Sequence, residues 1–183
     1  MYDLLIENGK IIDGTGSAAY PADVAAVNGE IVAIGKLEGE AAKTVDAQGM
    51  VVSPGFIDLH THTDLSFLLD STAQSKVRKG VTLELAGNCG GSPGAPLEGA
   101  AMDALETRLS EYPDVLEISW AGFGGYLDAI ERARATLNLA VQVGHGTVRS
   151  CVLGMESRAP DESEMERMKE LVAESLGSGA MGF

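Results

Sequence analysis

The chain has 183 residues, of which 45% are hydrophobic and 22% are charged, and its formal net charge is -14 at pH 7. This composition is typical of a globular protein with an apolar core and excludes a disordered chain. The negative charge also makes nucleic acid and anionic membranes poor partners, because the mean field of the protein repels phosphate.

The length of the chain excludes a complete α/β barrel, because such a barrel needs about 250 residues. No stretch reaches the roughly 20 apolar residues of a membrane-spanning helix, and Met1-Tyr2-Asp3 lacks the basic start of a secretory signal. A cytoplasmic location is therefore expected. In a reducing compartment Cys89 and Cys151 are expected to serve in metal binding or packing rather than in a disulfide.

The first fifty residues are typical of a small antiparallel β module. Short apolar runs predict strands at residues 4–7, 10–12, 23–27 and 31–34. Asn-Gly pairs at 8–9 and 28–29 separate these runs, and this dipeptide favours tight hairpins because both central residues adopt positive φ. We predict a domain over residues 1–53.

The remaining sequence alternates predicted strands with predicted helices, which indicates a parallel sheet with crossover helices. Strands are predicted at residues 55–59, 82–86, 140–143 and 180–183, and helices within 65–79, 100–112, 125–137 and 161–177. The last helix has a capping-box start at Asp161 and Glu164. Four strands make half of a TIM-type (β/α)8 barrel over residues 54–183, so the end of the chain is interpreted as a truncation.

Candidate metal ligands follow the first two strands of this predicted sheet. Asp58, His60 and His62 share one face of an extended strand, and Cys89 lies in a Gly-rich loop after the next strand. Alone, the histidines could be a surface pair and Cys89 a small buried residue. Because parallel strands end at one rim, two imidazoles and a thiolate there predict a zinc site.

Several motifs together resemble those of the amidohydrolase superfamily, over nearly the whole chain. They are Tyr2 to Gly16, Pro54 to Asp64, Ser75-Lys76-Val77 to Gly80-Val81-Thr82, Gly87-Asn88-Cys89-Gly90 and Gly144-His145-Gly146-Thr147-Val148-Arg149. The His-x-His block is similar to that of the superfamily in general. The Gly-Asn-Cys-Gly and Gly-His-Gly-Thr-Val-Arg motifs resemble specifically the N-acyl-D-amino-acid deacylases.

The resemblance implies a β-sandwich domain, incomplete here without C-terminal strands, fused to a (β/α)8 barrel that hydrolyses amides with one or two zinc ions. It implies that Cys89 is a zinc ligand and that His60 and His62 belong to a second, weaker metal position. Two further histidines and a catalytic aspartate would lie beyond residue 183. Little activity is therefore expected of the chain alone.

Four other residues are candidates for supporting roles. His145 and Arg149 could contact a substrate carboxylate or other polar group, or could equally be satisfied by local backbone and solvent. Asp58 and Asp64 could orient metal-binding histidines, although Asp64 could instead cap the following helix.

The resemblance implies hydrolysis of an N-acyl-D-amino acid as the leading function. A second hypothesis is a cyclic-amide or dipeptide hydrolase like the dihydroorotases and isoaspartyl dipeptidases. A third is a non-catalytic fragment that binds metal or self-associates through an exposed sheet edge.

Overall fold

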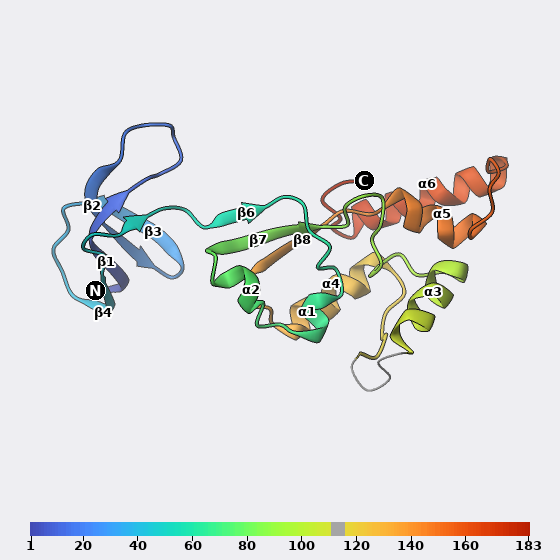
Figure 1. Ribbon diagram of the computed structural model, residues 1–183, viewed down its shortest axis with the longest axis horizontal. Coiled ribbons are helices and arrows are strands. Elements are labelled where there is room, and N and C mark those ends of the chain that lie inside the picture. Colours follow the sequence, from blue (N-terminus) through green and yellow to red (C-terminus); the bar gives the residue numbers. More distant parts are fainter. Residues whose placement is uncertain (111–115) are drawn as a thin grey trace. The chain divides into compact units, whose positions relative to one another are not determined.

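The computed structural model describes residues 1–110 and 116–183 and forms two compact units, Met1–Gly55 and Phe56–Phe183 (Figure 1). Each unit has its own sheet, and the two sheets are built differently. None of the helices in the described residues is long and apolar enough to cross a membrane.

The first unit contains one mixed five-stranded sheet. Its strands are β1 (Tyr2–Ile11), β2 (Tyr20–Val27), β3 (Glu30–Gly35), β4 (Ala41–Asp46) and β5 (Val51–Val52). The order is β3-β2-β1-β4, with β5 also paired to β1. Pairs β1–β2 and β2–β3 are antiparallel, whereas β4 and β5 run parallel to β1. The prediction of an antiparallel module is therefore confirmed for β1, β2 and β3 and wrong for the sheet as a whole, because β4 and β5 add parallel pairs.

The two Asn-Gly pairs have different roles in this sheet. Asn28 and Gly29 have φ of 53° and 80° and form the tight turn between β2 and β3, as predicted. Asn8, with φ of 61°, instead lies within the continuous strand β1, where the pairing with β2 shifts between Ile6 and Gly9. The prediction of a turn there is wrong, because a β-bulge can use the same positive φ.

The second unit contains a parallel sheet in the order β6-β7-β8. Its strands are β6 (Phe56–Asp58), β7 (Val81–Ala86) and β8 (Asn138–Val141), close to the first three predicted strands. The predicted fourth strand at 180–183 is not one, although the Met181 amide donates to the Val141 carbonyl at 2.8 Å. The fold is thus mixed α/β, and the described residues form no closed barrel.

Six helices in the described residues accompany this sheet. They are α1 (Ser66–Leu69), α2 (Gln74–Val77), α3 (Gly99–Leu109), α4 (Phe123–Ala133), α5 (His145–Leu153) and α6 (Glu162–Gly177). The single helix predicted within 65–79 is two short ones, because the Asp70 carboxylate accepts from the Thr72 amide and hydroxyl and forms a turn. The last two residues predicted for the helix at 100–112 lie outside the described residues, and α5 was not predicted.

The core of the second unit holds the loops after β6 and β7 in place. It contains mainly aromatic and aliphatic side chains from the helices, the segment before α4, the strand β8 and the loop after β7, including Trp120, Phe123, Tyr126, Val141, Val148 and Leu171. Helix α6 begins with the predicted capping box between Asp161 and Glu164, which is confirmed. The apolar faces of the helices thus pack beneath the loops that follow the strands.

Candidate metal centre

The two histidines lie in the segment that follows β6. This strand ends at Asp58 and the chain bends at His60, so the alternation of strand side chains does not continue to the histidines. Their ring centroids are nevertheless 5.6 Å apart, with the ring planes inclined by 67°. The bend therefore allows two neighbouring imidazoles to approach a common space.

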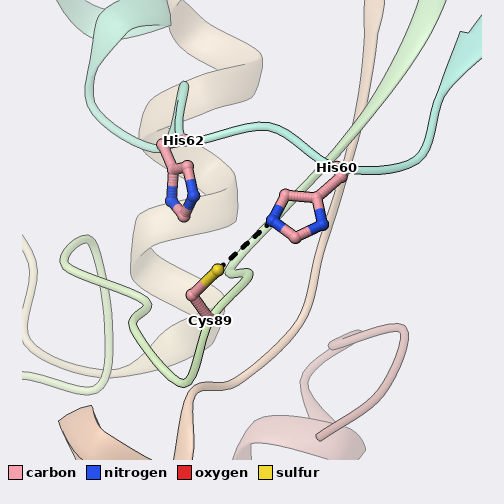
Figure 2. A group of neighbouring side chains, drawn as sticks. All are labelled: His60, His62 and Cys89. Atoms are coloured by element: carbon pink, nitrogen blue, oxygen red, sulfur yellow. Dashed lines mark hydrogen bonds between the residues drawn. The ribbon is translucent and has the colours of Figure 1, made fainter.

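Cys89 enters the same space from the loop after β7. Its φ of 56° is left-handed, and the Gly91 amide closes the turn on the Asn88 carbonyl at 3.1 Å. Its Sγ lies 3.2 Å from Nε2 of His60 (Figure 2). Figure 2 shows His60 and His62 directed toward the thiol from one side.

The donor atoms of His60, His62 and Cys89 all lie within 4.8 Å of one another, and all three residues are exposed. Among residues 1–110 and 116–183 they are the one group of three or more His, Cys, Asp or Glu side chains placed closely enough to share an ion. Two imidazoles and a thiol are donors that zinc prefers. The residues present therefore fit a zinc ion by their chemistry.

Close backbone contacts fix the Cys89 loop to the neighbouring strand and helix. The Gly146 amide at the start of α5 donates to the Gly90 carbonyl at 2.7 Å. A Cβ on Gly144 would lie 2.5 Å from that same oxygen, and a Cβ on Gly87 would lie 2.0 Å from the Gln142 carbonyl oxygen. Glycine is thus required at both positions for the loops to approach.

A cavity of about 570 Å³ adjoins the cluster. It is lined by residues of the loops after β6 and β7 and of α1 and α3, among them His62, Asp64, Asn88, Cys89 and Arg108. A ligand in this cavity would contact two of the three candidate metal ligands. Arg108 supplies positive charge there, in a protein that is otherwise strongly acidic.

The two predicted supporting carboxylates have different surroundings. Asp58 accepts from Nζ of Lys76 at 2.8 Å and from the backbone amide of His60 at 3.3 Å, and these contacts, the first above all, lower the pKa of its carboxyl. Asp64 is 1% exposed, and neither of its carboxylate oxygens makes a hydrogen bond within the described residues. Burial raises the pKa of Asp64. No hydrogen bond joins either carboxylate to an imidazole in the described part of the chain.

His145 and Arg149 lie outside the cluster. His145 begins α5, and its ring centroid is 6.0 Å from that of Phe183. Nη2 of Arg149 donates to the carbonyls of Glu156 and Arg158, at 2.5 and 2.8 Å, and so binds the segment between α5 and α6. A substrate contact for either residue stays a prediction.

Sequence reasoning missed Lys76 and Glu84. Nζ of Lys76, on α2, lies 2.8 Å from Oδ2 of Asp58 and 2.8 Å from Oε1 of Glu84, whose side chain is fully buried in β7. A charged residue in the middle of the apolar run 81–86 was a visible signal that it needs a partner.

Comparison with known proteins decides the family. Residues 43–183 match the model of the Amidohydrolase family. The chain belongs to that family. It is 40% identical to a D-aminoacylase of Alcaligenes xylosoxydans xylosoxydans, over 100% of this chain and 37% of the relative. It is 38% identical to an N-acyl-D-glutamate deacylase of the same organism, over 99% of this chain and 36% of the relative.

Solved structures agree with the sequence comparison. A crystal structure of D-aminoacylase matches with a TM-score of 0.86 at 36% identity, covering 100% of this chain and 38% of that one. An N-acyl-D-glutamate deacylase from Bordetella bronchiseptica, complexed with zinc and a phosphonate inhibitor, also matches with a TM-score of 0.86, at 34% identity and the same coverage. The predicted resemblance to the D-aminoacylase branch is confirmed, and this amidohydrolase chain spans a little over a third of the length of these relatives.

Proposed function

We propose that this amidohydrolase chain supplies the N-terminal part of a zinc-dependent hydrolase that cleaves the amide bond of N-acyl-D-amino acids. The observation that carries the proposal is the meeting of His60, His62 and Cys89 within 4.8 Å. The chain in which they meet is similar along its whole length to proteins named as D-aminoacylase and N-acyl-D-glutamate deacylase. The relative solved with zinc and a mimic of the tetrahedral intermediate supports the same chemistry.

His60, His62 and Cys89 would hold the metal, Cys89 as a thiolate. A zinc ion held there would polarise an amide carbonyl and would lower the pKa of a bound water toward about 7. The chain's own contribution is to hold the donors still. The Asn88 side chain donates to the carbonyls of Thr61 and Leu85, at 3.3 and 2.8 Å, and so links the histidine segment to the Cys89 loop.

The proposal extends to the architecture. We infer that residues 54–183 correspond to about half of a (β/α)8 barrel and that residues 1–53 belong to the small β domain of such enzymes. The parallel order β6-β7-β8 and the match to D-aminoacylase structures support this inference. The small-molecule substrate would enter at the carboxyl ends of these strands, where Cys89 lies. Self-association through the edge of the sheet stays a prediction, which sizing of the purified chain would test.

A chimera tests the proposed activity. The corresponding segment of the D-aminoacylase of Alcaligenes xylosoxydans xylosoxydans, to which this chain is 40% identical over 183 residues, is replaced by this chain. We expect release of amino acid from N-acetyl-D-amino acids and not from the L-enantiomers, with activity lost in Cys89→Ala and kept in Cys151→Ala. A folded, zinc-loaded chimera without activity on any N-acyl-D-amino acid would contradict the proposal.

Cobalt binding tests the metal site without any turnover. Cobalt(II) replaces zinc in Cys and His sites and gives a thiolate absorption band when sulfur binds it. We expect this band in the unchanged chain and in Cys151→Ala, because Cys151 packs against the core. Cys89→Ala should lack the band. The His145→Ala variant is the matched histidine control, and a loss of binding in it would place the metal elsewhere.

A further inference from the structure

The buried charge of Glu84 lies beside another carboxylate. In the parallel pairing of β6 with β7, Asp58 is the partner of Glu84, so their side chains leave the sheet on the same face. The Glu84 side chain is 0% exposed. Two neighbouring carboxylates repel each other, and a buried one without a counter-ion is costly.

Lys76 neutralises this pair from helix α2. Its Nζ lies 2.8 Å from one oxygen of each carboxylate, and its side chain is 26% exposed. The contact with Asp58, followed by that with Glu84, raises the pKa of Lys76, so the ammonium keeps its proton. One cation therefore joins α2 to two adjacent strands.

The remaining oxygens of the two carboxylates hold the segment that carries the histidines. At the start of that segment, Oδ1 of Asp58 accepts from the His60 amide at 3.3 Å. At its end, the Thr63 hydroxyl donates to Oε2 of Glu84 at 2.6 Å. Both ends of the residues between β6 and α1 are thus attached to the carboxylates that Lys76 bridges.

The same network continues to the Cys89 loop. The Thr61 hydroxyl lies 3.0 Å from that of Thr63 and can donate to it, because the proton of Thr63 goes to Glu84. The Thr61 amide donates to the Leu85 carbonyl at 3.1 Å. Asn88, next to Cys89, donates to Leu85 and Thr61 as described above. A continuous set of ion pairs and hydrogen bonds therefore runs from Lys76 to both loops of the metal centre, without Lys76 reaching a metal ligand's side chain.

We propose that Lys76 is a positioning residue for this metal centre: by bridging Asp58 and Glu84 it sets the distance between the imidazole of His60 and the thiol of Cys89. The role in metal binding rests on the proposed function, whereas the role in placing His60 against Cys89 does not. The bridge itself is a property of the fold, present before any ion binds.

The test must separate positioning from general stability. Lys76→Met alone leaves a buried Glu84 without its cation, and the chain could unfold for that reason alone. The double variant Lys76→Met/Glu84→Gln removes both charges and keeps a hydrogen-bonding group for Thr63. Lys76→Arg retains the cation, and Lys79→Met is the matched control, since Lys79 is exposed and forms no ion pair among the described residues.

Two measurements are made on each variant of the full chain. The first is the nuclear Overhauser effect between the His60 ring and the Cys89 β-protons without metal, and the second is titration with cobalt(II). We expect the double variant to melt within a few degrees of the unchanged chain, yet to lose the His60–Cys89 contact and to bind cobalt about 10 to 100 times more weakly. Lys76→Arg should restore most of both signals, and Lys79→Met should match the unchanged chain.

The outcomes are distinguishable. If the folded double variant keeps the His60–Cys89 contact and the cobalt affinity, Lys76 is only structural and the proposal is wrong. If the unchanged chain binds no cobalt, the proposed metal function fails, and the proton contact still decides whether Lys76 positions His60. If the double variant does not fold, Asp58→Asn replaces it, because this variant leaves the Lys76–Glu84 pair intact. We expect it to lose the His60–Cys89 contact as well. If Asp58→Asn keeps that contact, the proposal is wrong.

Discussion

The hydroxyl of Tyr126, in helix α4, donates a 2.5 Å hydrogen bond to the backbone carbonyl of Asp64, 62 positions earlier in the sequence. Tyr126 is 0% exposed, and its ring packs beside those of Trp120 and Phe123. Burial raises the pKa of this phenol far above its usual range, so it stays a donor. The contact fixes the start of α1, directly after the histidine segment, to the core.

Replacement of Tyr126 by Phe tests the value of this contact. The ring packing remains, but the buried Asp64 carbonyl loses its donor, which is expected to cost about 1–3 kcal/mol of unfolding free energy. Urea denaturation followed by circular dichroism measures the change. Tyr2→Phe is the control because no hydrogen bond of its hydroxyl is found in the described residues, and an equal loss in both variants would contradict the assignment.

Gly144→Ala is expected to destabilise the chain because the added Cβ meets the backbone of Gly90 and Gly91. Gly144 has φ of -85° and ψ of 130°, which alanine adopts freely, so the backbone itself is not strained. The added Cβ would lie 2.5 Å from the Gly90 carbonyl oxygen and would push the Cys89 loop away. We expect a loss of about 1–3 kcal/mol.

Gly122→Ala is the matched control, because an added Cβ there meets nothing within 4 Å. Thermal melting measures the stability of both variants, and cobalt titration of the variants that fold measures their metal affinity. Equal stability of Gly144→Ala and the unchanged chain would show that the loop moves aside at little cost.

Glu164 is expected to make the chain acid-sensitive over a defined range. Hydrogen bonds from Arg158 and from the Asp161 amide lower the pKa of Glu164 from its ordinary 4.5 to about 2. Because the folded pKa lies below the unfolded one, the carboxylate stabilises the fold above about pH 4.5 and loses this effect as the pH falls toward 2.

The Glu164→Gln variant should therefore differ most from the unchanged chain near neutral pH, and the difference should shrink on acidification. Urea denaturation between neutral pH and pH 3 measures it, with Glu131→Gln as an exposed helical control. A difference that stays constant with pH would show that the ionised carboxylate is not responsible.

Arg149→Ala distinguishes two roles for this residue. If its main role is to bind the carbonyls of Glu156 and Arg158, the variant loses about 1.5–3 kcal/mol of stability. Arg132→Ala, which removes an exposed arginine of α4, should change little. Unchanged stability of Arg149→Ala would leave Arg149 available for the substrate contact that the sequence suggested.

Much of the second unit could be predicted because its signals are local. The capping box at Asp161 and Glu164 and the apolar run 81–86 each depend on a few neighbouring residues. Helix α5 escaped prediction because glycines flank its first residue, His145, and its N-cap, Gly144, has no side chain to cap it. Its first turn is held instead by the contact of Gly146 with Gly90, which no local pattern reveals.

The residues of the candidate metal site could be predicted from the sequence, but the contacts that hold them in place could not. The His-x-His and Gly-Asn-Cys-Gly motifs, taken with the strand ends that they follow and with the family resemblance, predict His60, His62 and Cys89 as ligands. The ion pair of Lys76 with Glu84 depends on the register in which Asp58 faces Glu84, and register between parallel strands is a long-range property. The parallel pairing of β4 with β1 in the first sheet is also a long-range property, and no pattern within either strand predicts it.

The contact between Lys76 and Glu84 also limits how this sequence can change over generations. A single mutation that neutralises Lys76 passes through a protein with a lone carboxylate in its interior, which selection for foldability disfavours. Loss of this pair is thus accessible mainly when both codons change together or when a compensating change comes first. Lineages descending from this chain should therefore gain or lose the two residues as a unit.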